Sequence, residues 1–210
     1  MSININKNLN EEEIKKIALD IKKGKIAIFP TETVYGIGTN ALNENACAKI
    51  FEIKGRNNSK ALIVLISNYK MLESIVTDIN EIERKLMNKF WPGPLTIILK
   101  KKEIVPNVVT GGSNEVGVRM TSGEVAHFLV EKAGVPIVAP SANLSGEQTG
   151  TKIKIIIEEF SDKVDYIIDT GDIESDLTST VVKVENNKIR ILREGKIIKE
   201  ELSEIAEIVI

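Results

Sequence analysis

Three cationic side chains stand close together in one short segment of the chain. Lys54, Arg56 and Lys60 lie within seven residues, and Gly55 lets the backbone between the first two approach a ligand closely. Hydrogen bonds from a cation to phosphate are about twice as strong as neutral ones, and a planar guanidinium can hold two oxygens at once. The segment therefore favours a polyphosphate, with a triphosphate as the natural ligand. The spacing alone leaves a solvated basic loop open as the alternative.

Three other segments combine small hydroxyl side chains with glycine or proline, which fix the backbone. They are residues 30–36, 139–146 and 177–180. In the second, Ser141 and Asn143 follow an apolar run and Pro140, which makes the turn rigid. Small polar groups on a fixed turn suit a pocket for a phosphorylated ligand; the alternative is that they only cap the turn. Ser179 and Thr180 carry less weight, because such residues are common where a strand begins.

Arg119 is a cation inside an apolar strand pattern. Its neighbours Val118 and Met120 are apolar, and a buried cation without a partner would cost several kcal/mol. Arg119 must therefore lie at a rim or meet an anion, which is either a substrate carboxylate or the partner in a structural salt bridge. Arg193, at the end of another strand pattern, is open to the same interpretations, with a surface position as its alternative.

Apolar periodicity predicts the elements that must position these residues. Helices are expected between Asn10 and Gly24 and over residues 45–53, 78–89, 122–132 and 152–160. Capping boxes are expected at Asn10 with Glu13 and at Asp78 with Glu81. Strands are expected over residues 25–29, 62–66, 95–100, 116–120, 135–139 and 164–168, followed by a hairpin of residues 180–184 and 188–192.

This alternation of helices and strands is typical of an α/β fold, and the hairpin predicts a mixed sheet rather than a purely parallel one. Open α/β sheets bind ligands at the carboxyl ends of their strands. We therefore expect the four polar segments to follow strands and to converge on one pocket. No repeat, low-complexity tract or linker divides the sequence, so residues 1–210 are expected to form one domain.

The composition of the sequence excludes several classes of protein. The chain has 210 residues, 42% of them hydrophobic and 28% charged, which is ordinary for a globular protein, and its apolar runs are too short for a membrane helix. A net charge of −2 gives no global attraction to a polyanion. Cys47 has no partner for an internal disulfide, and Cys47 and His127 are too isolated for a zinc site, so no metal held by the protein is expected. The first ten residues resemble no signal peptide, which favours a reducing cytoplasm.

Taken in order, these segments resemble the threonylcarbamoyl-AMP synthase family, also called the YrdC type. The matching stretches, which span nearly the whole chain, are residues 29–38, 54–66, 90–95, 116–120, 140–146, 179–182 and 192–195. The resemblance implies a twisted mixed sheet flanked by helices around a concave, positively charged pocket. It also implies synthesis of threonylcarbamoyl-adenylate and pyrophosphate from L-threonine, bicarbonate or carbon dioxide, and ATP. The product feeds a tRNA-modifying threonylcarbamoyl transferase complex. The chain resembles the short form without the extra C-terminal domain of longer relatives.

The resemblance also assigns site residues. Lys54 and Arg56 would be catalytic. The ATP site would comprise Lys54, Arg56, Lys60, Ser141, Asn143, Thr149 and Arg193. The threonine site would comprise Thr31, Thr33, Arg119, Ala139 and Ser179, with Arg119 pairing the carboxylate. Mg²⁺ is expected to arrive on the ATP phosphates.

The chain departs from the family pattern at four positions: Ala61, Leu65, Glu115 and Thr121. The departures at Leu65 and Glu115 bear on threonine and nucleotide contacts respectively. Two alternative functions stay open. One is a related enzyme that makes carbamoyl-adenylate from carbamoyl phosphate. The other is an RNA-binding module without chemistry, against which the net charge and the 4% aromatic content argue, although a local basic patch would still allow weak RNA binding.

Overall fold

The computed structural model describes residues 4–7, 10–55, 57, 60–144, 146, 150–175 and 177–209. Its helices are α1 (Glu11–Lys22), α2 (Glu44–Lys54), α3 (Tyr69–Ile75), α4 (Glu81–Phe90), α5 (Asn107–Thr110), α6 (Glu124–Ala133), α7 (Ile153–Phe160) and α8 (Lys199–Ser203). Its strands are β1 (Asn4–Lys7), β2 (Ala27–Pro30), β3 (Tyr35–Asn40), β4 (Ile63–Ile66), β5 (Leu95–Lys100), β6 (Glu115–Met120), β7 (Ile137–Val138), β8 (Tyr166–Asp169), β9 (Thr180–Glu185), β10 (Lys188–Arg193) and β11 (Ile208–Val209).

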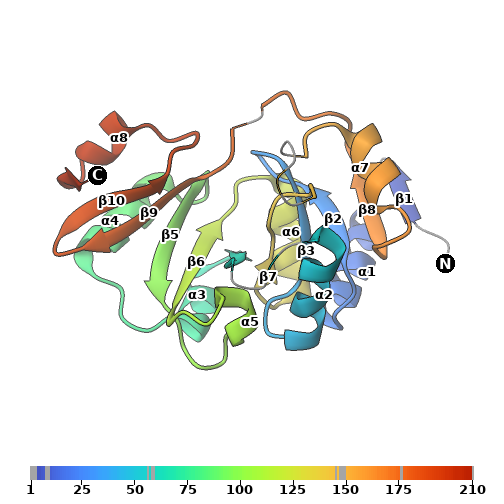
Figure 1. Cartoon of the computed structure of the whole chain (residues 1–210), viewed down its shortest axis with the longest axis horizontal. Helices are drawn as coiled ribbons and strands as arrows, with labels where there is room; N and C mark the ends of the chain where they lie inside the picture. The colour runs from blue at the N-terminus through green and yellow to red at the C-terminus, as the bar shows by residue number, and fades with distance from the viewer. Residues whose placement is uncertain are drawn as a thin grey trace.

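Within the described ranges the strands form an 11-stranded sheet in the order β1-β8-β2-β3-β7-β4-β6-β5-β9-β10-β11. The pairs β4 with β6 and β5 with β9 are parallel, whereas β2 with β3 and β5 with β6 are antiparallel. The predicted α/β fold with a mixed sheet is thus confirmed. In Figure 1, β5, β6, β9 and β10 lie toward one side of the molecule and β1, β2, β3 and β8 toward the other, with β7 between them.

Local sequence signals account for several element boundaries. Asn10 accepts a hydrogen bond from the Glu13 N–H at 3.0 Å and donates its own N–H to the Glu13 carboxylate at 3.0 Å, so the predicted capping box opens α1. Asn186 and Asn187 have φ values of 51° and 60° at the tip of the β9–β10 hairpin. Two successive left-handed residues are what a type I′ hairpin turn requires, and asparagine tolerates them well.

Other boundaries differ from the predictions. Helix α4 begins at Glu81, capped by Asn80 with Glu83, not by Asp78 with Glu81. The preceding segment is held extended because Thr77 donates its N–H to the Lys100 carbonyl at 2.9 Å. Strand β7 covers only two of the five predicted residues, since the prolines on either side of it have no N–H for the sheet.

Two of the polar segments expected after strands lie elsewhere. Lys54 is the last residue of α2, so the cationic segment begins at the end of a helix rather than after a strand, and residues 177–179 precede β9. Residues 35 and 36, expected in a loop, belong to β3. Pairing with β2 explains this strand: Phe29 lies opposite Gly36, and Ile28 lies opposite Ile37.

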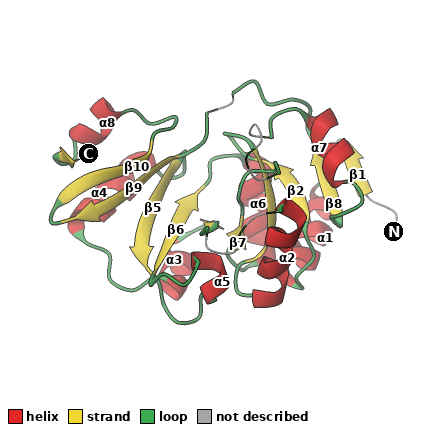
Figure 2. Cartoon of the chain, in the orientation of Figure 1, coloured by secondary structure: helices red, strands yellow, loops and turns green. Residues whose placement is uncertain are grey.

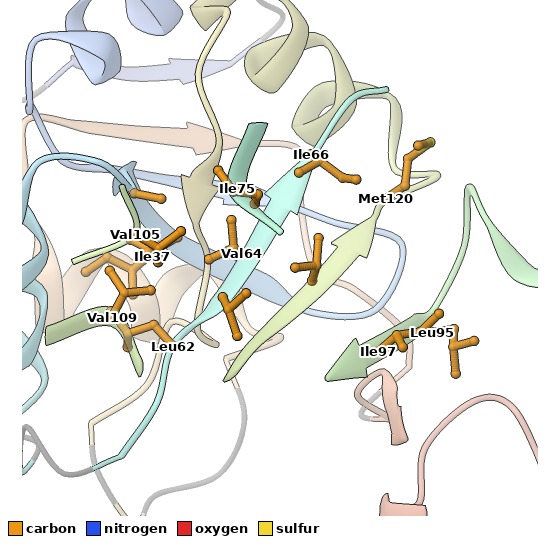
Figure 3. Packing of buried hydrophobic residues seen from close by; sticks show 14 of the residues in the cluster. Ile37, Leu62, Val64, Ile66, Ile75, Leu95, Ile97, Val105, Val109 and Met120 are labelled. Atoms are coloured by element: carbon orange, nitrogen blue, oxygen red, sulfur yellow. The ribbon is translucent and has the colours of Figure 1, made fainter. Parts of the chain in front are cut away.

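Two clusters of buried side chains pack on opposite faces of the sheet, as Figure 2 indicates by the helices on both sides of the strands. Along β2, Ile28 belongs to the larger cluster, whereas Ala27 and Phe29 belong to the smaller one with α1 and α6. Figure 3 shows the larger cluster, whose labelled members include Val64 of β4, Ile97 of β5, Ile75 of α3 and Val109 of α5. The period of two in each strand thus assigns alternate side chains to opposite faces.

Gly38 in β3 is a point of close contact between the two halves of the sheet. A Cβ atom there would lie 2.6 Å from the Val138 carbonyl oxygen of β7 and 2.7 Å from Cε1 of Phe29. At Gly117 in β6, a Cβ atom would meet the ends of the Thr96 and Ile98 side chains at 3.3 Å, and these can shift. The two glycines therefore form a matched pair for a stability test.

We predict that Gly38→Ala lowers the free energy of unfolding by about 1–3 kcal/mol, because backbone must move to admit the methyl group. Gly117→Ala is expected to change it by less than about 1 kcal/mol, since alanine is no worse than glycine in a strand. Urea denaturation at neutral pH measures both values. Equal effects of the two substitutions would show that the β3–β7 contact does not limit stability.

Candidate functional site

A cavity of about 250 Å³ lies over the central strands. Its volume lies just below the range typical of small-molecule sites, about 300–1,000 Å³. The predicted site residues that line it are Thr31, Thr33, Arg119, Ala139, Ser141, Ser179 and Arg193. Three of the four polar segments expected to meet therefore converge on one cavity, whereas no described residue of the segment 54–60 lines it.

Strand alternation builds the floor of this cavity. In β5, Leu95 and Ile97 are buried in the larger core cluster, whereas Thr96 and Ile98 line the cavity. In β6, Val118 is a core residue and Gly117 lines the cavity opposite Ile98. The absence of a side chain at Gly117 leaves depth above the sheet, and the neighbouring position on the same face is Arg119.

The turn between β2 and β3 brings two hydroxyl groups to the cavity. The Thr31 hydroxyl donates to the Val34 carbonyl at 2.7 Å and lies 2.9 Å from the Thr33 hydroxyl. The N–H groups of Thr33 and Val34 each donate to Thr31 Oγ1 at 3.2 Å. This turn is consequently fixed by its own side chains before any ligand binds.

Arg119 is 5% exposed, and each of the three nitrogens of its guanidinium has a contact with another residue. Nε donates to the Gly93 carbonyl at 3.2 Å, and Nη1 donates to the Thr33 hydroxyl at 3.1 Å. Nη2 lies 2.6 Å from Oε2 of Glu32 in an ion pair. This contact is an ion pair, and no other partner of the buried Nη2 is found among the described residues. The structural salt bridge left open by the sequence is therefore present.

Glu32 is the residue of this site that the sequence interpretation missed. Its Oε2 accepts the Thr121 hydroxyl at 2.5 Å, and its Oε1 accepts the Ser122 N–H at 3.1 Å. Burial alone would raise the pKa of Glu32, but the charge of Arg119 and these hydrogen bonds outweigh burial and lower it to about 2 from 4.5. No local signal in the sequence identifies Arg119, 87 residues away, as the partner of Glu32.

Ser179 and Arg193 form one unit at another wall of the cavity. Arg193 donates to the Ser179 carbonyl from Nε at 3.1 Å and from Nη2 at 2.8 Å, and Nη2 also donates to the Ser179 hydroxyl at 3.0 Å. The Thr96 hydroxyl lies 2.8 Å from the Ser179 hydroxyl. These contacts fix a cation and two hydroxyl groups beside one another.

Lys54 supports the Ser141–Asn143 turn from inside. It is 2% exposed, and its Nζ donates to the Ser141 carbonyl at 2.5 Å and to the Asn143 carbonyl. The Ser141 hydroxyl donates to Asn143 Oδ1 at 2.5 Å, and Ser141 pairs with Gly36 of β3. The sequence did contain a signal for the burial of Lys54, because it follows the buried Cys47 and Ile50 at helical spacing in α2.

The remaining predicted residues are not brought into this cavity by the described structure. Lys60 is exposed, and Asn143 does not appear in the cavity lining formed by the described residues. Arg56 and Thr149 lie outside the described residues. Ala61 and Leu65 line the cavity, and Glu115 forms an ion pair with Lys183 at 2.9 Å.

Two further properties of the described ranges bear on function. Across these ranges no three His, Cys, Asp or Glu side chains are grouped as they would be to hold a metal ion. None of the helices described has both the length and the apolar character needed to cross a membrane.

The low pKa of Glu32 makes stability depend on pH. A carboxylate whose pKa is lower in the folded state stabilises that state above its ordinary pKa of 4.5, and this contribution is lost as the pH falls toward 2. The linked free energy is on the order of 3 kcal/mol. We therefore predict that Glu32→Gln is less stable than the parent near neutral pH and that the gap narrows as the pH falls from about 5 to about 2.

Denaturation of both proteins across this pH range measures the difference in their free energies of unfolding. All other carboxylates are shared by the two proteins, so their titration largely cancels. A difference that stays constant over the range would contradict the assignment of the pKa shift to Glu32.

Known proteins resemble this chain in sequence and in fold. A relative from Pyrococcus abyssi, named threonylcarbamoyl-AMP synthase, is 42% identical over 97% of this chain. A relative from Methanocaldococcus jannaschii, named putative threonylcarbamoyl-AMP synthase, is 40% identical over 90% of this chain and 90% of its own length. The crystal structure of P. abyssi Sua5 complexed with L-threonine is 42% identical, with a TM-score of 0.91 over 99% of this chain and 62% of that one.

This chain spans only 60% of the length of the P. abyssi relative. The family model Sua5/YciO/YrdC, described as telomere recombination, matches residues 20–195. This match covers most of the chain, and the mixed sheet and the cavity accord with the resemblance drawn from the sequence. The chain therefore belongs to the Sua5/YciO/YrdC family.

Proposed function

We propose that the protein is an L-threonylcarbamoyladenylate synthase, which joins L-threonine, bicarbonate or carbon dioxide, and ATP, and releases pyrophosphate. The observation that carries the proposal is the buried guanidinium of Arg119, which lines the cavity and is fixed there by Glu32, Thr33 and Gly93. A carboxylate is the ligand that best pairs with such a guanidinium. The names of the relatives and the L-threonine complex of P. abyssi Sua5 support threonine as the source of that carboxylate.

In this proposal the threonine end of the cavity is built around Arg119. The substrate carboxylate accepts from Nη2 of Arg119, and the hydroxyl groups of Thr31, Thr33 and Ser179 are the polar groups near it. Ala139 contributes a small side chain to the wall. These groups are already fixed by one another, so little conformational entropy is lost when threonine binds.

The nucleotide end is proposed at Arg193 and Ser141. Arg193 would contact the phosphates, while Lys54 holds the backbone of the Ser141 turn. The roles of Arg56, Lys60, Asn143 and Thr149 in ATP binding, and the catalytic role of Lys54 and Arg56, remain part of the proposal. Mg²⁺ would be held by the phosphates, where it would neutralise charge during the transfer.

In the proposed reaction, bonds form and break between the substrates, and the protein itself takes little covalent part. The threonine amine loses a proton and attacks carbon dioxide, and an oxygen of the resulting carbamate attacks the α-phosphorus as pyrophosphate leaves. The cations of the site stabilise the developing charge, and the cavity protects the carbamate from water. The low pKa of Glu32, about 2, makes this carboxylate a poor proton acceptor.

The product would pass to a tRNA-modifying threonylcarbamoyl transferase complex, with weak RNA binding by a local basic patch as a further proposal. We place the reaction in the cytoplasm, where ATP and tRNA are both present. The single cysteine fits that placement: Cys47 is fully buried, and burial raises the pKa of its thiol to about 12, so it behaves as a small apolar residue.

The proposal is tested by incubating the purified protein with ATP, Mg²⁺, labelled bicarbonate and one amino acid at a time. Labelled threonylcarbamoyl-adenylate and pyrophosphate are expected with L-threonine alone. Product formed from carbamoyl phosphate without bicarbonate would favour the related carbamoyl-adenylate enzyme. RNA binding with a steep salt dependence and no ATP turnover would favour the RNA-binding module.

We predict that Arg119→Ala lowers threonine-dependent pyrophosphate release by about 100-fold, because the substrate carboxylate loses a charged donor. Arg190→Ala is the matched control: Arg190 is half exposed, pairs with Glu185 at 3.6 Å and lies outside the cavity lining formed by the described residues. Its removal is expected to leave the rate within about twofold. Near-normal release by folded Arg119→Ala would reject the proposed carboxylate site.

A further inference from the structure

We propose that Glu32 is a positioning residue for threonine: it holds the Arg119 guanidinium in the orientation that receives the substrate carboxylate. This inference rests on the proposed function and adds a residue to it. Glu32 does not belong to the cavity lining formed by the described residues. Its effect on the substrate must therefore pass through Arg119.

The backbone turns Glu32 away from the cavity while its neighbours face it. Thr31 and Thr33 line the cavity, whereas the Glu32 carboxylate reaches the Thr121 hydroxyl and the Ser122 N–H at the start of α6. The side chain of Glu32 is 18% exposed and that of Arg119 is 6% exposed, so the ion pair is largely shielded from water. A shielded pair of this kind is stronger and less sensitive to salt than a surface pair.

The backbone of Glu32 is fixed as firmly as its side chain. Lys196 donates from Nζ to the Glu32 carbonyl at 2.5 Å, across 164 residues of sequence. Gly123 packs so closely that a Cβ atom there would lie 2.8 Å from the Glu32 nitrogen. The carboxylate is thus presented to Arg119 from a rigid base.

Arg119 depends on this anion for both charge and orientation. The other two contacts of its guanidinium are neutral, to the Gly93 carbonyl and the Thr33 hydroxyl. Glu32 is the one described carboxylate in ion-pair contact with it. Without that charge, a buried cation would be left with neutral partners, and its side chain would move toward water or the substrate in a less defined geometry.

Thr121 is one of the four positions at which the chain departs from the family pattern. In this chain the Thr121 hydroxyl donates to Glu32 at 2.5 Å and accepts the Gly123 N–H at 3.2 Å. Thr121 therefore provides a mild way to loosen Glu32 without removing its charge.

The experiment compares Glu32→Gln and Glu32→Asp with the parent protein. Calorimetry measures the binding of L-threonine without ATP, and pyrophosphate release gives kcat and the KM values for threonine and for ATP. We expect Glu32→Gln to raise the threonine Kd and KM at least tenfold. The KM for ATP should stay within about twofold, and Glu32→Asp should recover part of the loss because it keeps the charge.

Asp20→Asn is the matched control. The Asp20 side chain has a similar exposed fraction, 16%, and accepts the Tyr166 hydroxyl at 2.5 Å, but its ion-pair partners are exposed lysines and it belongs to another part of the fold. We expect this variant to lose stability without a change in either KM. If Glu32→Gln does not fold, Thr121→Val carries the test, with a threonine-specific rise of about two- to fivefold in KM.

The outcomes separate the inference from the function on which it rests. Failure of the parent protein to bind L-threonine or to release pyrophosphate would overturn the proposed function itself. With an active parent, an unchanged threonine KM in folded Glu32→Gln, or in Thr121→Val if Glu32→Gln does not fold, would overturn the positioning role alone. Equal rises in the KM values for threonine and ATP, or the same kinetic change in Asp20→Asn, would also overturn it, because they indicate a general loss of structure.

Discussion

A guanidinium placed inside a sheet has to be neutralised, and the Glu32–Arg119 ion pair meets this requirement at 2.6 Å. The pair joins the end of β6 to the β2–β3 turn, and Glu32 extends the connection to the start of α6 and, through its carbonyl, to Lys196. Three segments that are distant in sequence, around Glu32, Arg119 to Ser122, and Lys196, thereby acquire one fixed relative position. The cavity walls depend on that position, because the Thr31–Thr33 turn and Arg119 both belong to it.

The site orients its other cations through backbone carbonyl groups. Lys54 donates to the Ser141 and Asn143 carbonyls, Arg193 to the Ser179 carbonyl, and Lys196 to the Glu32 carbonyl. A carbonyl group orients a cation without carrying a full opposite charge. Such an arrangement suits a cavity proposed to receive phosphates, because preorganised positive groups need not move when charge develops.

The sequence predicts those parts of the fold that depend on local patterns. The capping box of α1, the bounds of β5 and the Asn186–Asn187 hairpin are of this kind, since each is determined by neighbouring residues. Strand β3 was not predicted, because its two glycines weaken the strand pattern and pairing with β2 and β7 determines it. The site follows the same division. The residue types indicated the cavity, and helical spacing in α2 contained a signal for the burial of Lys54, but the pairing of Glu32 with Arg119 and the carbonyl partners of Lys54 depend on tertiary packing.

The central claim is that Arg119, held by Glu32, receives the carboxylate of the substrate. An experimental structure of the protein with L-threonine bound tests this most directly, through the distance from Nη2 of Arg119 to the nearest carboxylate oxygen. We expect a charge-assisted hydrogen bond of about 2.7–2.9 Å, with the Glu32 contact retained. A carboxylate bound elsewhere in the cavity, or an Arg119 side chain that leaves Glu32 to bind it, would show that Arg119 is not held in place by Glu32 to receive the substrate.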